Sequence, residues 1–161
     1  RMKFFSGRKT LAVAGMAFFS VMALGITGCD KDNDDERVYT ISGNASGSQV
    51  VPAVIGNGTG TITGTYDPNN RMLTYTTSWS NLSSAPTSAR FYNGNSGTSG
   101  TPTGNPWTLG SGLTGAGNYS GTMTLTSDEE TQLTRGKWYY SYSTTGNPNG
   151  EVRGQVTATQ Q

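Results

Sequence analysis

Apolar and aromatic side chains recur at every second position in short runs from Val38 onward, and Gly, Asn, Pro and Ser separate the runs. This alternation is typical of half-buried β-strands, whereas the helical period is almost absent. It predicts an all-β sandwich or barrel of seven or eight strands. The expected strands cover residues 38–43, 59–66, 72–79, 88–92, 119–126, 137–143 and 151–157, with a weaker extended segment at residues 49–54.

A tight turn is expected between the second and third of these strands, at Tyr66-Asp67-Pro68-Asn69-Asn70. Proline presets φ and asparagine tolerates left-handed geometry, so the flanking strands should form a hairpin. Residues two apart on a strand share a face, which defines the predicted core. Its members are Leu73, Tyr75, Thr77 and Trp79 on one strand, Met123 with Leu125, and Val152 with Val156.

One short helix interrupts the β pattern. The run Ser127-Asp128-Glu129-Glu130 fits a capping box, with Ser127 as N-cap and Glu130 reaching back, and predicts a helix over residues 128–134. The carboxylates in this run are therefore assigned to capping rather than to catalysis.

The amino-terminal segment has the three zones of a secretory signal peptide. Basic residues open it, an apolar stretch runs from Leu11 to Ile26, and small residues precede Cys29. The stretch is about 16 residues long, which is short of the roughly 20 that span a bilayer. Residues 1–28 are thus predicted to be a signal peptide, and an uncleaved signal anchor is the alternative.

The run Ile26-Thr27-Gly28-Cys29 resembles the lipobox of bacterial lipoproteins, in which a cysteine after small residues is lipidated before cleavage. Cys29 is the only cysteine of the chain, and lipidation removes a thiol that would be a liability in an oxidising compartment. The resemblance implies a membrane anchor, such as palmitate and diacylglycerol, on Cys29.

Residues 29–37 are predicted to form a flexible tether, because the run from Asp30 to Glu36 is too polar to bury apolar surface. A calcium loop is the alternative. The EF-hand pattern requires glycine and glutamate where this chain has Asp35 and Ile41. The acidic run also resembles the stretch that directs some Bacteroidetes lipoproteins to the cell surface, which implies the outer membrane and surface exposure.

Composition excludes several functions. After Cys29 the chain has seven basic and ten acidic residues, a net charge of −3 without a Lys/Arg cluster, so nucleic acid is not an expected partner. Histidine is absent. A Ser-His-Asp triad, a Cys-His pair and imidazole-bound zinc or copper are therefore excluded, and we expect no metal and no cofactor.

Two motifs roughly 100 residues apart carry a family resemblance. They are Gln49-Val50-Val51-Pro52-Ala53-Val54 and Gly150-Glu151-Val152-Arg153-Gly154-Gln155-Val156. They resemble the opening Gln-Glu-Val-Pro-Pro-Val and the closing Gly-Glu-Ile-Arg-Gly-Gln of the CHRD domain, a module named from chordin and also found in microbial secreted proteins. The resemblance implies one domain over residues 38–161 and a Greek-key β-barrel that is immunoglobulin-like or superoxide-dismutase-like. It implies no established activity.

Many members of that family carry a His-x-His pair in a middle strand and a third histidine in the penultimate strand. The matching positions here are Arg90 and Tyr92, with the third near Ser143, so the resemblance implies that the family's histidines are replaced. A candidate ligand face without metal remains, and it comprises Arg90, Tyr92, Tyr140 or Tyr142, Glu151 and Arg153. Glu151 and Arg153 are expected on one side of their strand. Cross-strand ion pairs are the favoured explanation for both charges.

Residues 93–106 form a long polar stretch without periodicity, which is typical of a functional or a mobile loop. Trp107 follows it and is a candidate exposed aromatic for stacking on a sugar ring or another surface. The favoured alternative is that Trp107 folds back onto the edge of the sandwich.

These features predict a lipid-anchored cell-envelope lipoprotein whose β domain is a binding or structural module for a protein or glycan, without catalytic activity. The alternative is a carboxylate-dependent hydrolase of envelope or extracellular polysaccharide, for instance through Asp67 with Glu151. Such a pair must lie roughly 5–10 Å apart. No oligomeric state is predicted.

Overall fold

A computed structural model describes residues 37–161. The expected signal peptide, Cys29 and the acidic run up to Glu36 lie outside the described residues. The elements are β1 Tyr39–Ser46, the 3-10 helix η1 Gly47–Gln49, β2 Thr59–Asp67, β3 Met72–Ser80, β4 Pro86–Asn93, β5 Thr101–Thr103, β6 Gly117–Thr124, α1 Ser127–Thr134, β7 Trp138–Thr144, β8 Val152–Gln155 and β9 Thr157–Gln160. Within residues 37–161, no helix has the length and apolar character that crossing a bilayer requires.

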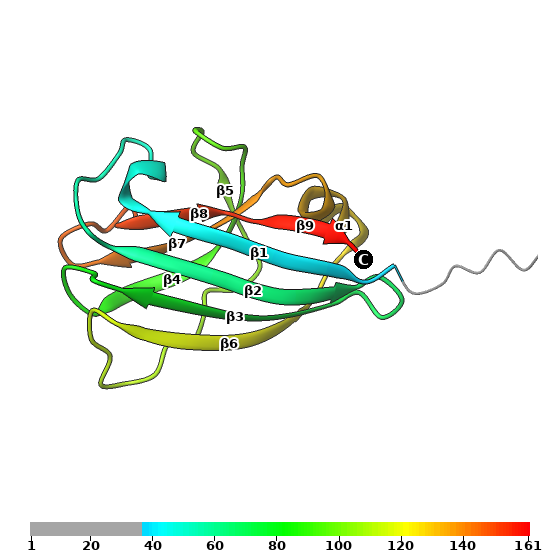
Figure 1. Cartoon of the computed structure of the whole chain (residues 1–161), viewed down its shortest axis with the longest axis horizontal. Coiled ribbons are helices and arrows are strands. Elements are labelled where there is room, and N and C mark those ends of the chain that lie inside the picture. The colour runs from blue at the N-terminus through cyan, green and yellow to red at the C-terminus, as the bar shows by residue number, and fades with distance from the viewer. Residues whose placement is uncertain (1–36) are drawn as a thin grey trace, which may run out of the picture. The chain divides into compact units, whose positions relative to one another are not determined.

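The strands form one curled antiparallel sheet in the order β5-β4-β7-β8-β1-β2-β3-β6, and β9 pairs with β1. In Figure 1, β4 and β7 lie behind β1, β2 and β3, so the sheet covers its own core as a half-barrel. The meander β1-β2-β3 has β8 returning beside β1, which is the Greek-key arrangement. The predicted all-β sandwich or barrel is confirmed.

The core lies between the two halves of the curled sheet, and aromatic rings fill it. Tyr75 of β3 meets Phe91 of β4 at 4.9 Å between ring centroids, and Trp79 meets Tyr142 of β7 at 5.0 Å. A buried hydrogen bond joins the hydroxyls of Thr77 and Tyr142 across the same space. The predicted core is confirmed for the β3 face and for Leu125, Val152 and Val156, while Met123 is only partly buried.

The hairpin between β2 and β3 is confirmed, with Asp67 paired to Met72. Asp67 Oδ1 accepts a hydrogen bond of 2.9 Å from the Asn69 amide, and Asn70 Oδ1 accepts one of 2.8 Å from the Met72 amide. The left-handed residue is Arg71, with φ of 55°, rather than either asparagine. The asparagine and aspartate side chains hold the turn through hydrogen bonds instead.

The extended segment predicted at residues 49–54 is wrong. The amides of Val50 and Val54 both donate to the Gly47 carbonyl, at 3.1 and 3.0 Å, which folds the chain back on itself after η1. Pro52 has no amide proton to give to a ladder. The segment is a loop between β1 and β2.

Three element boundaries also differ from expectation. The capping box uses Thr126 and Glu129 rather than Ser127 and Glu130, because the same pattern occurs one residue earlier and Thr126 has the extended backbone of an N-cap. The expected strand over residues 151–157 is divided at Val156, whose amide donates to the Trp138 carbonyl at 2.8 Å. The polar stretch at residues 93–106 contains the short strand β5.

Candidate functional site

The two sequence motifs meet in the structure. The 3-10 helix η1 joins β1 to the first motif, and β1 pairs with β8, which carries most of the second, so that Ser46 lies opposite Arg153. The amide group of Gln49 donates to the Asn44 carbonyl at 2.8 Å, and its Oε1 accepts from the Gln155 amide at 3.4 Å. Gln49 therefore ties the loop after β1 to the end of β8.

The two glycines of the closing motif are required by close backbone packing. Gly150 has φ of 117°, which disfavours any side chain, and a Cβ there would lie 2.6 Å from Ser141 Oγ. A Cβ on Gly154 would lie 2.7 Å from the Tyr140 ring and 2.8 Å from the Asn44 carbonyl oxygen. β8 thus approaches both β7 and β1 more closely than a side chain permits.

The outer face of β4, β7 and β8 carries the charged and aromatic side chains of the site. Strand register places Arg90, Ser141 and Arg153 in one row across the three strands, because paired residues of antiparallel strands share a face. Tyr92 and Tyr139 form the adjacent row.

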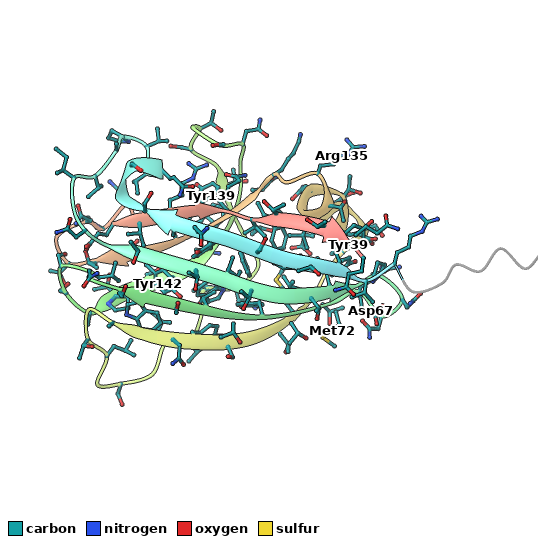
Figure 2. All side chains as sticks on the ribbon, in the orientation of Figure 1. Tyr39, Asp67, Met72, Arg135, Tyr139 and Tyr142 are labelled. Carbon is teal, nitrogen blue, oxygen red and sulfur yellow. The ribbon has the colours of Figure 1, made fainter. Side chains whose placement is uncertain are left out.

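Tyr140 and Tyr142 occupy the opposite face and are fully buried in the core. Tyr139 and Tyr142, both labelled in Figure 2, are an odd number of residues apart on β7 and therefore point to opposite faces of the sheet. The expectation that Tyr140 or Tyr142 joins the ligand face is therefore wrong. Alternation along β7 from Ser143 selects Tyr139 and Ser141 instead.

Arg153 is the most enclosed charge on this face, with 4% of its side chain exposed. Nη1 donates to the Thr98 carbonyl and Nη2 to the Asn95 carbonyl, both at 2.7 Å. The guanidinium carbon lies 3.5 Å from the centre of the Tyr139 ring. Burial lowers the pKa of Arg153, although an arginine remains protonated at neutral pH.

Arg153 and Tyr139 together hold the loop between β4 and β5. The Tyr139 hydroxyl accepts from the Gly100 amide at 3.0 Å, close to the carbonyls that Arg153 binds. The Tyr92 ring stacks on Tyr139 with centroids 5.0 Å apart and planes 6° apart. A cation and two tyrosine rings thus form one continuous surface.

A cavity of about 400 Å³ opens beside this surface, and we call it the motif cavity. Val50, Val51 and Pro52 of the opening motif form one wall, and Tyr92, Tyr139 and Arg153 form the other. Its volume lies within the roughly 300–1,000 Å³ of small-molecule sites. Both family motifs therefore line the same cavity.

Glu151 lies at a different place from Arg153, although the sequence predicted one face. Its carboxylate accepts hydrogen bonds from the Ser83 amide at 2.7 Å, from the Ser83 hydroxyl at 2.5 Å and from the Thr144 hydroxyl at 2.6 Å. Burial acts to raise the pKa of Glu151, but these bonds, with one from Asn147, outweigh it and lower the pKa. The group is a structural anion held by hydroxyls.

A second cavity, of about 520 Å³, adjoins Glu151, and we call it the Glu151 cavity. Ile55, Asn57, Asn81 and Asn147 are among the residues that line it. Glu151 and Arg153 do not pair with each other. Hydroxyls and a backbone amide bind the Glu151 carboxylate, and backbone carbonyls bind the Arg153 guanidinium. The favoured interpretation as cross-strand ion pairs is therefore wrong.

Arg90 lies on the same outer face as Arg153, one strand beyond Ser141. Its Nη2 donates to the Gly104 carbonyl at 2.8 Å, and its guanidinium carbon lies 6.0 Å from the Tyr92 ring centre. The structure thus brings Arg90, Tyr92 and Arg153 together on one face. Within residues 37–161 no three cysteine or acidic side chains gather closely enough to hold a metal ion.

Trp107 is 6% exposed and packs into the aromatic core instead of standing on the surface. Its ring stacks on Tyr119 at 5.3 Å with planes 9° apart, and Phe91 meets it edge-on at 5.1 Å. Its amide donates to the Ala89 carbonyl at 2.9 Å. The favoured interpretation, in which Trp107 folds back onto the sandwich, agrees with this placement.

Asp67 and Glu151 lie at opposite ends of β3, so the pair named for a hydrolase is not available. Asp67 is paired beside Met72 at the start of the strand, whereas Glu151 binds Ser83, just beyond its end at Ser80. The strand between them spans about 26 Å. No single glycosidic bond reaches both carboxylates.

Comparison with known families fixes the class of this domain. The sequence profile of the CHRD domain matches residues 41–156, which spans both motifs and most of the chain. The chain belongs to the CHRD domain family. No curated protein and no solved structure matches it. The CHRD domain of this protein is therefore the all-β half-barrel described above.

Proposed function

We propose that this protein is an exported lipoprotein, fixed to the bacterial cell envelope by lipid on Cys29, whose CHRD domain binds a ligand and performs no catalysis. The lipobox-like run before Cys29 and the acidic run after it support the anchoring and an outer-membrane location. A tether over residues 29–37 would reach at most about 30 Å. The domain would thus stand close to the membrane.

The position of the two family motifs carries the binding proposal. β1 begins at Tyr39 at one end of the sheet and ends at Ser46 at the other, roughly 23 Å away (Figure 1). The loop that contains Val51 and Ile55 follows Ser46, and the motif cavity lies where Ser46 of β1 is opposite Arg153 of β8. The recognition end is therefore opposite the end at which the chain enters the domain.

The loop at that end exposes apolar side chains. Ile55 is fully exposed and Val51 is 41% exposed, which is uncommon for aliphatic residues so close together on a small domain. Val51 lines the motif cavity, and Ile55 lines the Glu151 cavity. An apolar loop between two cavities with polar linings suits the binding of a partner.

The residue types that commonly act as catalytic groups in enzymes are either absent from this chain or have other proposed roles in it. The chain contains no histidine, and its one cysteine is the proposed lipid attachment site. Glu151 is committed to four hydrogen bonds. If Arg90, Tyr92 and Ser143 replace family histidines, the guanidinium of Arg90 supplies no ligand for a metal, and the face serves recognition instead.

Retention of ligand by the anchored protein tests this function. The lipidated protein is incorporated into liposomes and incubated with labelled polysaccharides and envelope extract, and bound label is counted. The double variant Val51→Asp/Ile55→Asp is expected to lose most of the bound label. Met72→Asp, which alters an exposed apolar residue at the opposite end of the sheet, should retain it. Equal retention by all three proteins would contradict the proposal.

A further inference from the structure

We propose that the motif cavity is a subsite for an acidic sugar, in which Arg153 receives the carboxylate and the Tyr92 ring supports the pyranose. The proposal deepens the binding function proposed above and rests on it. It follows from the charge balance of the cavity, from the donors left on Arg153 and from the mixture of side chains that line the cavity.

The charge on Arg153 is enclosed without an anion. Burying a cation costs free energy unless an opposite charge or a full set of acceptors surrounds it. Within residues 37–161, the partners of this guanidinium are two neutral carbonyls and the Tyr139 ring. Arginine has five N–H donors, and these two carbonyls occupy two of them.

The described carboxylates are engaged elsewhere. Asp67 lies in the turn between β2 and β3, Asp128, Glu129 and Glu130 lie in the first turn of α1, and Glu151 accepts from Ser83 and Thr144. On the outer face of β4, β7 and β8, the charged side chains are Arg90 and Arg153. This face is therefore positive, which favours an anionic ligand.

The remaining lining of the motif cavity suits a sugar better than a bare anion. Ser99 and Asn149 bring a hydroxyl and an amide group to the lining, and both can exchange hydrogen bonds with sugar hydroxyls. The Ser141 hydroxyl donates to the Val152 carbonyl at 2.9 Å. The half-buried Tyr92 ring, which stacks on Tyr139, offers a flat apolar surface on the lining of the same cavity as Arg153. An acidic sugar has a carboxylate beside a ring that bears hydroxyl and C–H groups. The carboxylate matches the cation, the hydroxyl groups match the amide, and the C–H groups match the aromatic ring.

The loop from residue 94 to residue 100 makes the subsite rigid. Arg153 binds the Asn95 and Thr98 carbonyls, and Tyr139 binds the Gly100 amide, so the wall of the cavity is fixed before a ligand arrives. Binding to a preformed wall avoids the entropy cost of ordering a loop.

Calorimetric titration of the chain from residue 30 onward tests the subsite, since all nine strands and the core lie within residues 39–160. Glucuronate and trigalacturonate are the acidic probes, with glucose and galactose as neutral counterparts. The acidic probes are expected to bind at least tenfold more tightly than the neutral sugars. Arg153→Gln should abolish this preference and Tyr92→Leu should weaken uronate binding at least fivefold. Arg135→Gln, which removes a positive charge from the end of α1, should leave binding unchanged.

Several outcomes overturn the proposal. They are equal affinity for acidic and neutral sugars, no binding of either, unchanged uronate affinity in Tyr92→Leu, and equal loss of affinity in Arg135→Gln. N-acetylglutamate binding as tightly as glucuronate would show a carboxylate site that does not recognise sugar, which also overturns it. If Arg153→Gln does not fold, Tyr92→Leu and the uronate-to-neutral ratio decide. If the calorimetric titration fails but the liposome-bound protein still retains ligand, the acidic-sugar subsite is wrong and the proposed binding function stands.

Discussion

The guanidinium carbon of Arg153 lies 3.5 Å from the centre of the Tyr139 ring, and both side chains hold the same loop. A cation–π contact in a desolvated position is worth about 2 kcal/mol. Arg153 comes from the closing family motif and Tyr139 from β7, which carries no family motif identified in the sequence. The motif arginine is thus connected to the cavity wall through a residue that lies outside both motifs.

Arg153→Lys is predicted to destabilise the domain by about 2–4 kcal/mol, because lysine keeps the charge but loses the planar fork that binds two carbonyls and stacks on Tyr139. Urea unfolding measures the change, and amide exchange at Gly100 should accelerate. The control Arg135→Lys should stay within about 0.5 kcal/mol of wild type. A change that small for Arg153→Lys would mean that the guanidinium contacts contribute little.

Glu151 is predicted to make the domain sensitive to acid. Its pKa is lowered in the folded state, so its stabilisation is complete above the ordinary glutamate pKa of about 4.3 and is lost as pH falls through the lower folded value. Glu151→Gln should cost about 1–3 kcal/mol at neutral pH, because the amide nitrogen cannot accept from the surrounding donors.

Urea midpoints between pH 7 and pH 2.5 test the sign of this effect. The wild type should lose stability below about pH 4.3, and its curve should approach that of Glu151→Gln as the pH falls. Parallel curves over the whole range would show that the carboxylate charge at Glu151 does not contribute to folding.

The buried hydroxyl pair of Thr77 and Tyr142 is predicted to behave as a unit. Tyr142→Phe leaves the Thr77 hydroxyl without its strongest partner and should cost about 1–3 kcal/mol. The double variant Thr77→Val/Tyr142→Phe should be destabilised by less than the sum of the two single variants. Thermal unfolding of the four proteins gives the coupling energy, and strict additivity would show that the two hydroxyls act independently.

Gly154→Ala is predicted to destabilise the domain by about 1–3 kcal/mol, because the added methyl group would press against the Tyr140 ring and the Asn44 carbonyl. Gly56→Ala is the matched control, since a Cβ at Gly56 meets nothing within 4 Å. Its stability should lie within about 0.5 kcal/mol of wild type or slightly above it. Equal effects at both positions would contradict the close approach of β8 to its neighbours.

Much of the fold follows from alternation in the sequence. The face of β3 with Tyr75 and Trp79 and the hairpin at Asp67 both follow from local period and turn composition. The capping box was predicted one residue late because Thr126 and Ser127 each have a glutamate three residues on. Local pattern specifies the element but not which of two adjacent caps is used.

The site was harder to predict because it depends on long-range pairing. Nothing near Arg153 in the sequence indicates that its partners are the Asn95 and Thr98 carbonyls, more than 50 residues away. Glu151 leaves the face of Arg153 because it precedes β8, where strand alternation no longer applies. Tyr139 was within reach of sequence reasoning, since it alternates with Ser143 on β7.

Metabolic labelling with a palmitate analogue tests most directly whether this CHRD domain works while fixed to the envelope by Cys29. The full-length chain should incorporate the label and fractionate with membranes, and Cys29→Ser should remain unlabelled and be found in the soluble fraction. The domain itself should fold identically in both proteins, as judged by the same urea midpoint. Cys29→Ser that still incorporates palmitate and remains with the membranes would contradict the account.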